Sequence, residues 1–210
     1  MPGRRSFDGA RALVTGASSG LGRAVAEGVP AADLTVVAAD LTVEADRRRL
    51  LEVVAETFDG RLDLAFNVAG VEAYGRFESH DESISRRVFE INVFSLMEMC
   101  RGELPMLRRG ERPYLVNMGS IVARRRLPGR SEYSASKFAV AGFTDAIRAE
   151  WSRDGIGILL VTPASPRQPS RRTWSSTRPS TRSTTAGRCP PRGWPRRPCG
   201  PSLVARPRSC

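Results

Sequence analysis

Short apolar runs alternate with longer amphipathic segments from residue 10 to residue 162, and this order limits the possible folds more than any other feature. The apolar runs predict strands at Arg11–Gly16, Leu34–Asp40, Leu62–Gly70, Tyr114–Ser120 and Ile156–Thr162. The segments between them predict helices at Leu21–Gly28, Val43–Phe58, Asp81–Leu107 and Tyr133–Trp151. Continuous apolar strands that alternate with helices indicate a parallel sheet with both faces covered. We therefore expect an α/β, Rossmann-like doubly wound fold of about five strands, with ligands at the carboxyl ends of the strands.

The pattern stops at Pro163. Residues 163–210 contain eleven arginines, no Asp, Glu or Lys, and ten of the fifteen prolines. The whole chain has 33 basic and 22 acidic residues, so residues 1–162 are formally neutral and the remainder carries the entire charge of +11. Such a composition cannot bury enough apolar surface to offset the cost of ordering. We expect one domain at residues 1–162 and a disordered tail at residues 163–210.

Several classes of protein are disfavoured. No apolar run is long enough to span a bilayer, and the opening MPGRRSF has no apolar core of a signal peptide, which favours a cytoplasmic protein. His80 is the only histidine, and the four cysteines lack the spacing of zinc ligands, so no metal site is expected.

The stretch TGASSGLG, Thr15–Gly22, follows the first predicted strand and opens the first predicted helix. Glycines here permit a tight turn, and the free N–H groups at the helix start suit a pyrophosphate. The same letters also spell G-x-S-x-G around Ser18, which is the pattern of a hydrolase nucleophile. That mechanism needs a histidine later in the chain, and none follows His80. The position between strand and helix favours a dinucleotide site.

Tyr133 and Lys137 stand four residues apart on a predicted helix, so their side chains share one face. Lys137 is the only lysine in the chain. A nearby ammonium is expected to lower the pKa of a tyrosine and to make it a general acid or base. Ser120, at the end of a predicted strand, could donate a hydrogen bond to a substrate oxygen.

At this point the sequence resembles the short-chain dehydrogenases/reductases over nearly all of residues 8–163. The family pattern Thr-Gly-x-x-x-Gly-x-Gly lies at Thr15–Gly22, Asn-Asn-Ala-Gly appears as Asn67-Val68-Ala69-Gly70, and Tyr-x-x-x-Lys is Tyr133 with Lys137. Ser120 and Asn92 match the family's serine and helix asparagine.

The resemblance implies NAD or NADP as the cofactor, hydride exchange with a small-molecule carbonyl or secondary alcohol, and assembly into homo-oligomers. It assigns Tyr133 as the acid/base, Lys137 as the group that lowers its pKa and holds the nicotinamide ribose, Ser120 as the group that polarises the substrate oxygen, and Asn92 as the residue that positions a water. The implied cofactor-binding residues are Thr15, Gly16, Ser18, Ser19, Gly20, Leu21, Gly22, Asp40, Asn67, Ala69, Gly70, Tyr133, Lys137 and Pro163.

The sequence departs from the family after the first helix. Besides Val68, which replaces an asparagine, only residues 28–33 stand where the family has a second strand and helix. The residue that would choose between NAD and NADP is therefore missing. We expect the strand Leu34–Asp40 to move next to Arg11–Gly16, because an empty place would leave backbone groups unpaired. Asp40 would then contact either the adenine, as in the family, or the ribose, as in a generic dinucleotide fold.

The last departure begins at Pro163, where the family continues with Pro-Gly, a substrate-covering segment and a seventh strand. A reading frame displaced by one base near Thr162 and Pro163 accounts for the change, since the displaced frame can encode PGVTET. We accordingly expect weak turnover from this chain. Two alternatives stay open: an inactive remnant that still binds nucleotide, and a protein whose arginine-rich tail binds polyanions.

Overall fold

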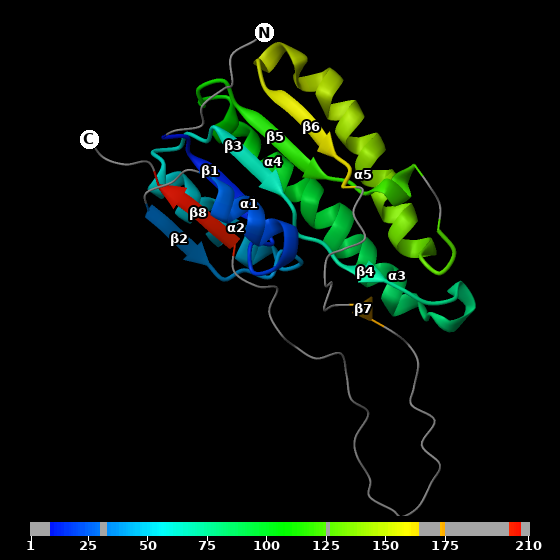
Figure 1. Ribbon diagram of the computed structural model, residues 1–210. Helices are drawn as coiled ribbons and strands as arrows, with labels where there is room; N and C mark the ends of the chain where they lie inside the picture. The colour runs from blue at the N-terminus through cyan, green and yellow to red at the C-terminus, as the bar shows by residue number, and fades with distance from the viewer. Residues whose placement is uncertain (1–8, 30–32, 125–126, 164–172, 175–201, 207–210) are drawn as a thin grey trace, which may run out of the picture.

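The five predicted strands all form and lie in one sheet (Figure 1). The computed structural model describes residues 9–29, 33–124, 127–163, 173–174 and 202–206. The predicted strands are β1 (Ala12–Thr15), β2 (Asp33–Val37), β3 (Leu64–Asn67), β5 (Tyr114–Met118) and β6 (Gly157–Val161). β1 pairs with β3, β3 with β5, and β5 with β6, each in parallel. The predicted α/β, Rossmann-like architecture is confirmed.

The place beside β1 is filled by a segment that the sequence analysis did not assign to a strand. β8 (Ser202–Arg206) lies between β1 and β2 and runs antiparallel to both, so the sheet order is β2-β8-β1-β3-β5-β6. The expectation that the strand at Leu34–Asp40 moves next to the first strand is therefore wrong. β8 supplies the backbone partners that β1 and β2 would otherwise lack, which removes the physical reason for that movement.

The predicted helices form with small changes at their ends. They are α1 (Gly20–Gly28), α2 (Glu44–Thr57), α3 (Glu82–Phe89), α4 (Ser95–Leu107) and α5 (Ser131–Glu150). α3 and α4 are joined by η2 (Glu90–Phe94), a π turn, and together they cover the single helix expected at Asp81–Leu107. The Asp81 carboxylate accepts a hydrogen bond from the backbone N–H of Ile84 and so caps the start of α3.

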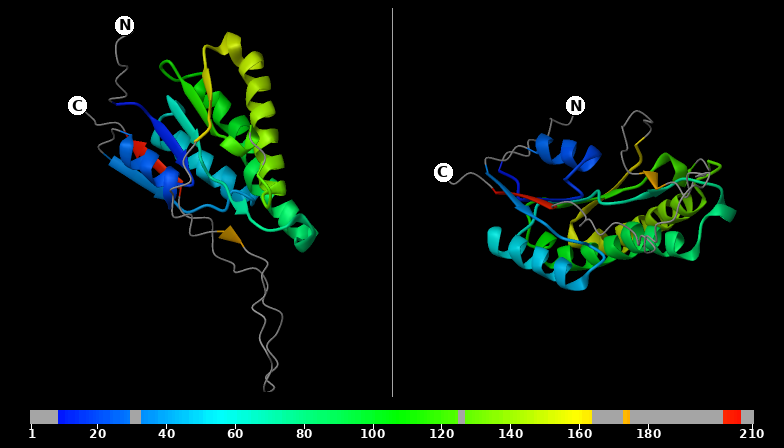
Figure 2. Two further views of the ribbon diagram at one scale, coloured as in Figure 1. Left: turned by 45° about the vertical axis from the view of Figure 1, so that its right-hand side comes forward. Right: turned by 90° about the horizontal axis from the view of Figure 1, so that it is seen from below.

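The helices cover the two faces of the sheet unequally. α2, α4 and α5 lie on one face, and α1 lies on the other (Figure 2). The main core lies under the three helices, where Leu13, Leu115 and Ile158 from the sheet meet the buried faces of those helices. A smaller cluster joins Val14 of β1 to Ala26 of α1. The doubly wound arrangement of the prediction is present, with most of the buried apolar surface on one side.

The α1 face is open at the β6 edge. Leu159 and Val161 alternate with the buried Ile158 along β6, and both are exposed.

Among the described residues, no helix is both long enough and apolar enough to cross a membrane.

Short elements complete the described chain, and most of the predicted tail lies outside the described residues. β4 (Glu72–Ala73) pairs in parallel with β7 (Thr173–Trp174). The remaining short elements are η1 (Phe77–Ser79), η3 (Ile121–Ala123) and η4 (Trp151–Asp154).

Candidate active site

The glycine-rich turn after β1 has no space for a side chain at Gly16 or Gly22. Gly16 has φ +70°, and a Cβ added there would lie 2.7 Å from the Cα of Ala69. A Cβ added at Gly22 would lie 2.3 Å from the carbonyl oxygen of Gly16. Glycine at these two positions lets α1 begin directly against the turn and lets the turn after β3 approach it. The structure therefore brings the predicted turns Thr15–Gly22 and Asn67–Gly70 together.

Thr15 joins these two turns. Its Oγ1 accepts hydrogen bonds from the backbone N–H groups of Val68, at 3.1 Å, and Ala69, at 3.3 Å. Ser18, Ser19 and Gly20 are exposed beside this junction. Ser19 is the N-cap of α1 and makes no side-chain capping hydrogen bond. The helix start thus offers unsatisfied N–H groups and a positive dipole end, which fit the pyrophosphate of NAD or NADP.

Asp40 lies in the loop after β2. Its carboxylate accepts hydrogen bonds from the backbone N–H of Thr42, at 3.0 Å, and from the Thr42 hydroxyl, at 2.7 Å. Its own backbone N–H donates to the Asp46 carboxylate at 2.7 Å. Because β8 separates β2 from β1, Asp40 is two strands away from the glycine turn. Asp40 is therefore not in the place beside the first strand for which a contact with the ribose was considered.

Asn67 begins the turn after β3 and directs its side chain into the interior of the protein. Its side chain is buried, and its Nδ2 donates to the Glu103 carboxylate, at 3.0 Å, and to the Asn117 side-chain oxygen, at 3.3 Å. Burial raises the pKa of the Glu103 carboxyl to about 7. Glu103 was not singled out from the sequence, although an acidic residue on an otherwise apolar helix face was a usable signal. These hydrogen bonds thus anchor the turn after β3 to α4 and β5.

Ser120 and Tyr133 meet at the carboxyl end of β5. The Ser120 hydroxyl lies close enough to the Tyr133 phenol to act on its pKa, and it accepts a hydrogen bond from the backbone N–H of Val122 at 3.4 Å. Burial raises the pKa of the Tyr133 phenol, while the Ser120 hydroxyl and the positive charge of Arg130 act in the opposite direction. The phenol is therefore protonated at neutral pH. The lower pKa of Tyr133 that was expected from the neighbouring Lys137 is not what the structure shows.

Lys137 lies one helical turn after Tyr133, as its spacing predicts. Its Nζ is 5.8 Å from the centroid of the Tyr133 ring and donates to the carbonyl oxygen of Met118 at 2.8 Å. The side chain is buried, and burial lowers its pKa to about 8. The Lys137 ammonium is therefore still mostly charged at neutral pH, and the pKa of Tyr133 is raised because burial of the phenol itself is the largest cause acting on it.

Asn92 lies in the π turn η2 and connects the turn after β3 to α5. Its Nδ2 donates to the carbonyl oxygen of Val71, at 2.9 Å, and to the Ser136 hydroxyl, at 3.0 Å, while its Oδ1 accepts from the Val71 N–H. A Cβ added at Gly70 would lie 3.1 Å from Asn92 Oδ1 and 3.6 Å from Lys137 Nζ. The glycine therefore brings the backbone of this turn close to the lysine.

Sequence reasoning did not identify a buried pair beside this site. His80 Nδ1 lies 2.8 Å from an oxygen of Glu132, the residue before Tyr133, and both side chains are buried. His80 is the only histidine of the chain, and from the sequence it was weighed only as a metal ligand or as the histidine of a hydrolase. Among the described residues, no group of three or more His, Cys, Asp and Glu side chains is placed to hold a metal ion.

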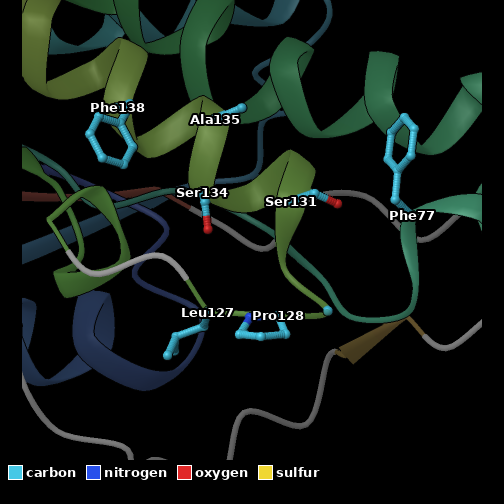
Figure 3. A pocket seen from close by; sticks show the side chains of 8 residues that line it. Phe77, Leu127, Pro128, Ser131, Ser134, Ala135 and Phe138 are labelled. Atoms are coloured by element: carbon cyan, nitrogen blue, oxygen red, sulfur yellow. The ribbon is translucent and has the colours of Figure 1, made fainter.

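A pocket of about 650 Å³ lies along the opposite side of α5 (Figure 3). Its lining residues are Phe77, Leu127, Pro128, Gly129, Ser131, Ser134, Ala135 and Phe138. Ser131, Ala135 and Phe138 share one stripe of the helix, whereas Tyr133 and Lys137 project from another. The pocket therefore lies on a different face of α5 from the Ser120–Tyr133 site and does not contain it. Pro163 follows β6 at the same edge of the sheet as Ser120 and is partly exposed.

Comparison with protein families identifies a short chain dehydrogenase pattern over residues 31–178. The chain is also 30% identical, over 72% of its own length, to the 3-ketodihydrosphingosine reductase of Bacteroides thetaiotaomicron. It spans 62% of that reductase and similar shares of two further curated relatives, 60% and 61%.

Solved structures show the same likeness. A short-chain dehydrogenase from Streptomyces avermitilis matches with a TM-score of 0.68 and 30% identity, covering 78% of this chain and 70% of the other. A short-chain dehydrogenase/reductase from Burkholderia phymatum, solved in complex with NAD, matches with a TM-score of 0.68 and 27% identity. That match covers 76% of this chain and 67% of the other.

Proposed function

The chain belongs to the short-chain dehydrogenase family, and we propose that it binds NAD or NADP and exchanges a hydride with a carbonyl or secondary alcohol of a small molecule. The observation that carries the proposal is that Ser120 lies beside the Tyr133 phenol, with Lys137 one turn away and the glycine-rich turn at the same edge of the sheet. The NAD-bound relative from Burkholderia phymatum supports the cofactor class.

The cofactor site proposed here is the junction of the two turns. The N–H groups at the start of α1 would hold the pyrophosphate, where Ser18, Ser19 and Gly20 are exposed. Asp40, two strands from the glycine turn, is assigned to the adenine side rather than to the ribose. Lys137 would hold the nicotinamide ribose, as the resemblance implies. The bound cofactor supplies or accepts the hydride.

The chain's own residues handle the proton and the substrate oxygen. In the reducing direction, Tyr133 donates its phenolic proton to the oxygen of the carbonyl group as that oxygen gains the electron pair of the broken π bond. The raised pKa of Tyr133 keeps this proton available at neutral pH. Ser120 would donate a hydrogen bond to the same oxygen and stabilise its developing charge. Asn92 is proposed to support reprotonation of Tyr133 by positioning a water near η2.

Cofactor binding tests the proposal directly. Addition of the purified chain to NADH or NADPH should change the fluorescence of the reduced nicotinamide with a saturable dependence on concentration. Gly22→Ala should abolish the change, because its Cβ would lie 2.3 Å from the Gly16 carbonyl oxygen. Gly28→Ala is the matched control on the same helix, since nothing lies within 4 Å of a Cβ there. Failure of the parent to bind either nucleotide would refute the proposed function.

Substrate class and homo-oligomer formation stay predictions from the family resemblance, and the cytoplasmic location stays a prediction from the pattern of apolar residues in the sequence. Turnover by this chain is expected to be slow, because Leu159 and Val161 are exposed on β6 and the family's substrate-covering segment is replaced in the sequence. Loss of reduced-nicotinamide absorbance with a panel of small carbonyl compounds would measure that turnover.

A further inference from the structure

We propose that His80 and Glu132 form a positioning pair that holds Tyr133 in its partly buried place beside Ser120. The inference rests on the proposed function, because it concerns the residue to which the proton transfer was assigned. The pair joins the segment after β4 to the first turn of α5, two elements that lie beside each other at the same end of the molecule (Figure 1).

The first turn of α5 lacks an ordinary cap. Arg130 is its N-cap residue and makes no side-chain capping hydrogen bond. Helix starts usually depend on a Ser, Thr, Asp or Asn side chain at this position, and its absence costs about 1 kcal/mol. Since Tyr133 belongs to this uncapped turn, other contacts must hold the phenol in place.

Three contacts supply that restraint. The Arg130 guanidinium pairs with the Glu72 carboxylate, and the backbone N–H of Gly75 donates to the carbonyl oxygen of Gly129 at 3.0 Å. The third contact is the one between His80 and Glu132, at 2.8 Å. It is the contact nearest to Tyr133 in the sequence, and its two side chains are only 1% and 4% exposed.

The two side chains of the pair have little freedom to move. A Cβ added at Gly75 would lie 2.4 Å from His80 Nε2, so the imidazole ring packs directly against that glycine. The other oxygen of Glu132 accepts a hydrogen bond from the Ser131 hydroxyl at 2.7 Å. Burial alone would raise the pKa of Glu132, but the hydrogen bonds from Ser131, its own backbone and His80 lower it. Glu132 is therefore a carboxylate that is held on both sides.

The position of the pair in the chain explains its effect on the site. The chain runs from the turn Asn67–Gly70, which belongs to the proposed cofactor site, through β4 and η1 to His80. The contact between His80 and Glu132 thus links the position of that turn to the position of Tyr133. A displacement of about 1 Å between reacting groups can cost roughly a hundredfold in rate.

The test measures the environment of Tyr133 without cofactor or turnover. The ultraviolet absorbance of tyrosinate is titrated in the full chain, and the same titration in Tyr133→Phe identifies the contribution of this phenol. His80→Ala should shift the midpoint of Tyr133 downward, toward the ordinary value, because burial is what raises its pKa. His80→Asn should restore the parent midpoint, since the Asn amide nitrogen can take the place of Nδ1 and donate to Glu132.

A control separates positioning from general loss of stability. Val140→Ala removes buried side-chain volume from the same helix and leaves the pair intact. It should lower the melting temperature without moving the Tyr133 midpoint. An unchanged midpoint in His80→Ala, or an equal shift in Val140→Ala and in His80→Asn, would overturn the inference. Since this titration needs no nucleotide, its outcome does not depend on whether the proposed oxidoreductase function holds.

Discussion

The surroundings of the buried Glu103 carboxyl predict how the free energy of unfolding changes with pH. Glu103 is fully buried on α4, and its carboxylate accepts a hydrogen bond from Asn67 Nδ2 at 3.0 Å. Burial raises its pKa from 4.5 to about 7. In the unfolded chain the carboxyl ionises near the lower value, and in the folded chain near the upper one.

The sign of the effect follows from proton binding. Below the unfolded pKa both states are protonated, and the folded state has its full stability from this group. Between the two pKa values the unfolded state binds fewer protons, so stability falls as the pH rises, by about 1.4 kcal/mol for each pH unit. Over the whole interval the loss amounts to about 3 kcal/mol.

Glu103→Gln is the appropriate perturbation, because glutamine keeps the shape and an oxygen that can accept from Asn67 but does not titrate. Urea unfolding followed by tryptophan fluorescence gives the free energy of unfolding of both proteins from about pH 5 to about pH 8. The free energy of the variant minus that of the parent should increase across this range by about 2–3 kcal/mol.

Glu98→Gln is the matched control on the same helix. The hydrogen bond from Arg101 lowers the pKa of Glu98, so this carboxylate is ionised throughout the range and its replacement should give a difference that does not vary with pH. Parallel curves for the parent and Glu103→Gln would refute the reasoning, because they would mean that Glu103 is ionised in the fold at little cost.

The remaining predictions concern the site and the sheet. Gly22→Ala should lower stability by about 1–3 kcal/mol through overpacking against the turn, whereas Gly28→Ala should not, as thermal unfolding can measure. Tyr133→Phe should reduce any measurable carbonyl reduction by about 10²-fold or more and leave NADH affinity unchanged in a fluorescence titration. Carbonyl reduction should decline as the pH rises through about 8, where Lys137 loses its charge, and a flat pH profile would contradict this role. Val204→Pro should lower the melting temperature, because β8 is paired on both sides and proline removes a backbone donor, whereas Val204→Thr should not.

Most of the framework could be predicted from local sequence. The apolar runs that form β1, β3 and β5 are read from neighbouring residues, because periodicity and strand propensity depend on short segments of chain. The glycine-rich turn and Ser120 lie at one edge of the sheet because parallel strands place their carboxyl ends there, whereas the joint role of Ser120 and Tyr133 came from the family resemblance. The spacing of Tyr133 and Lys137 likewise needs only the helical repeat.

Features that depend on contacts between residues far apart in the sequence were decided only by the tertiary structure. Local sequence did not predict that Ser202–Arg206 pairs between β1 and β2, since nothing near that segment specifies its neighbours. Desolvation, which depends on everything packed around a group, reversed the expected direction of the Tyr133 pKa and raised that of Glu103. The contact between His80 and Glu132 was hidden for the same reason: the two residues are 52 positions apart, and only the fold makes them neighbours.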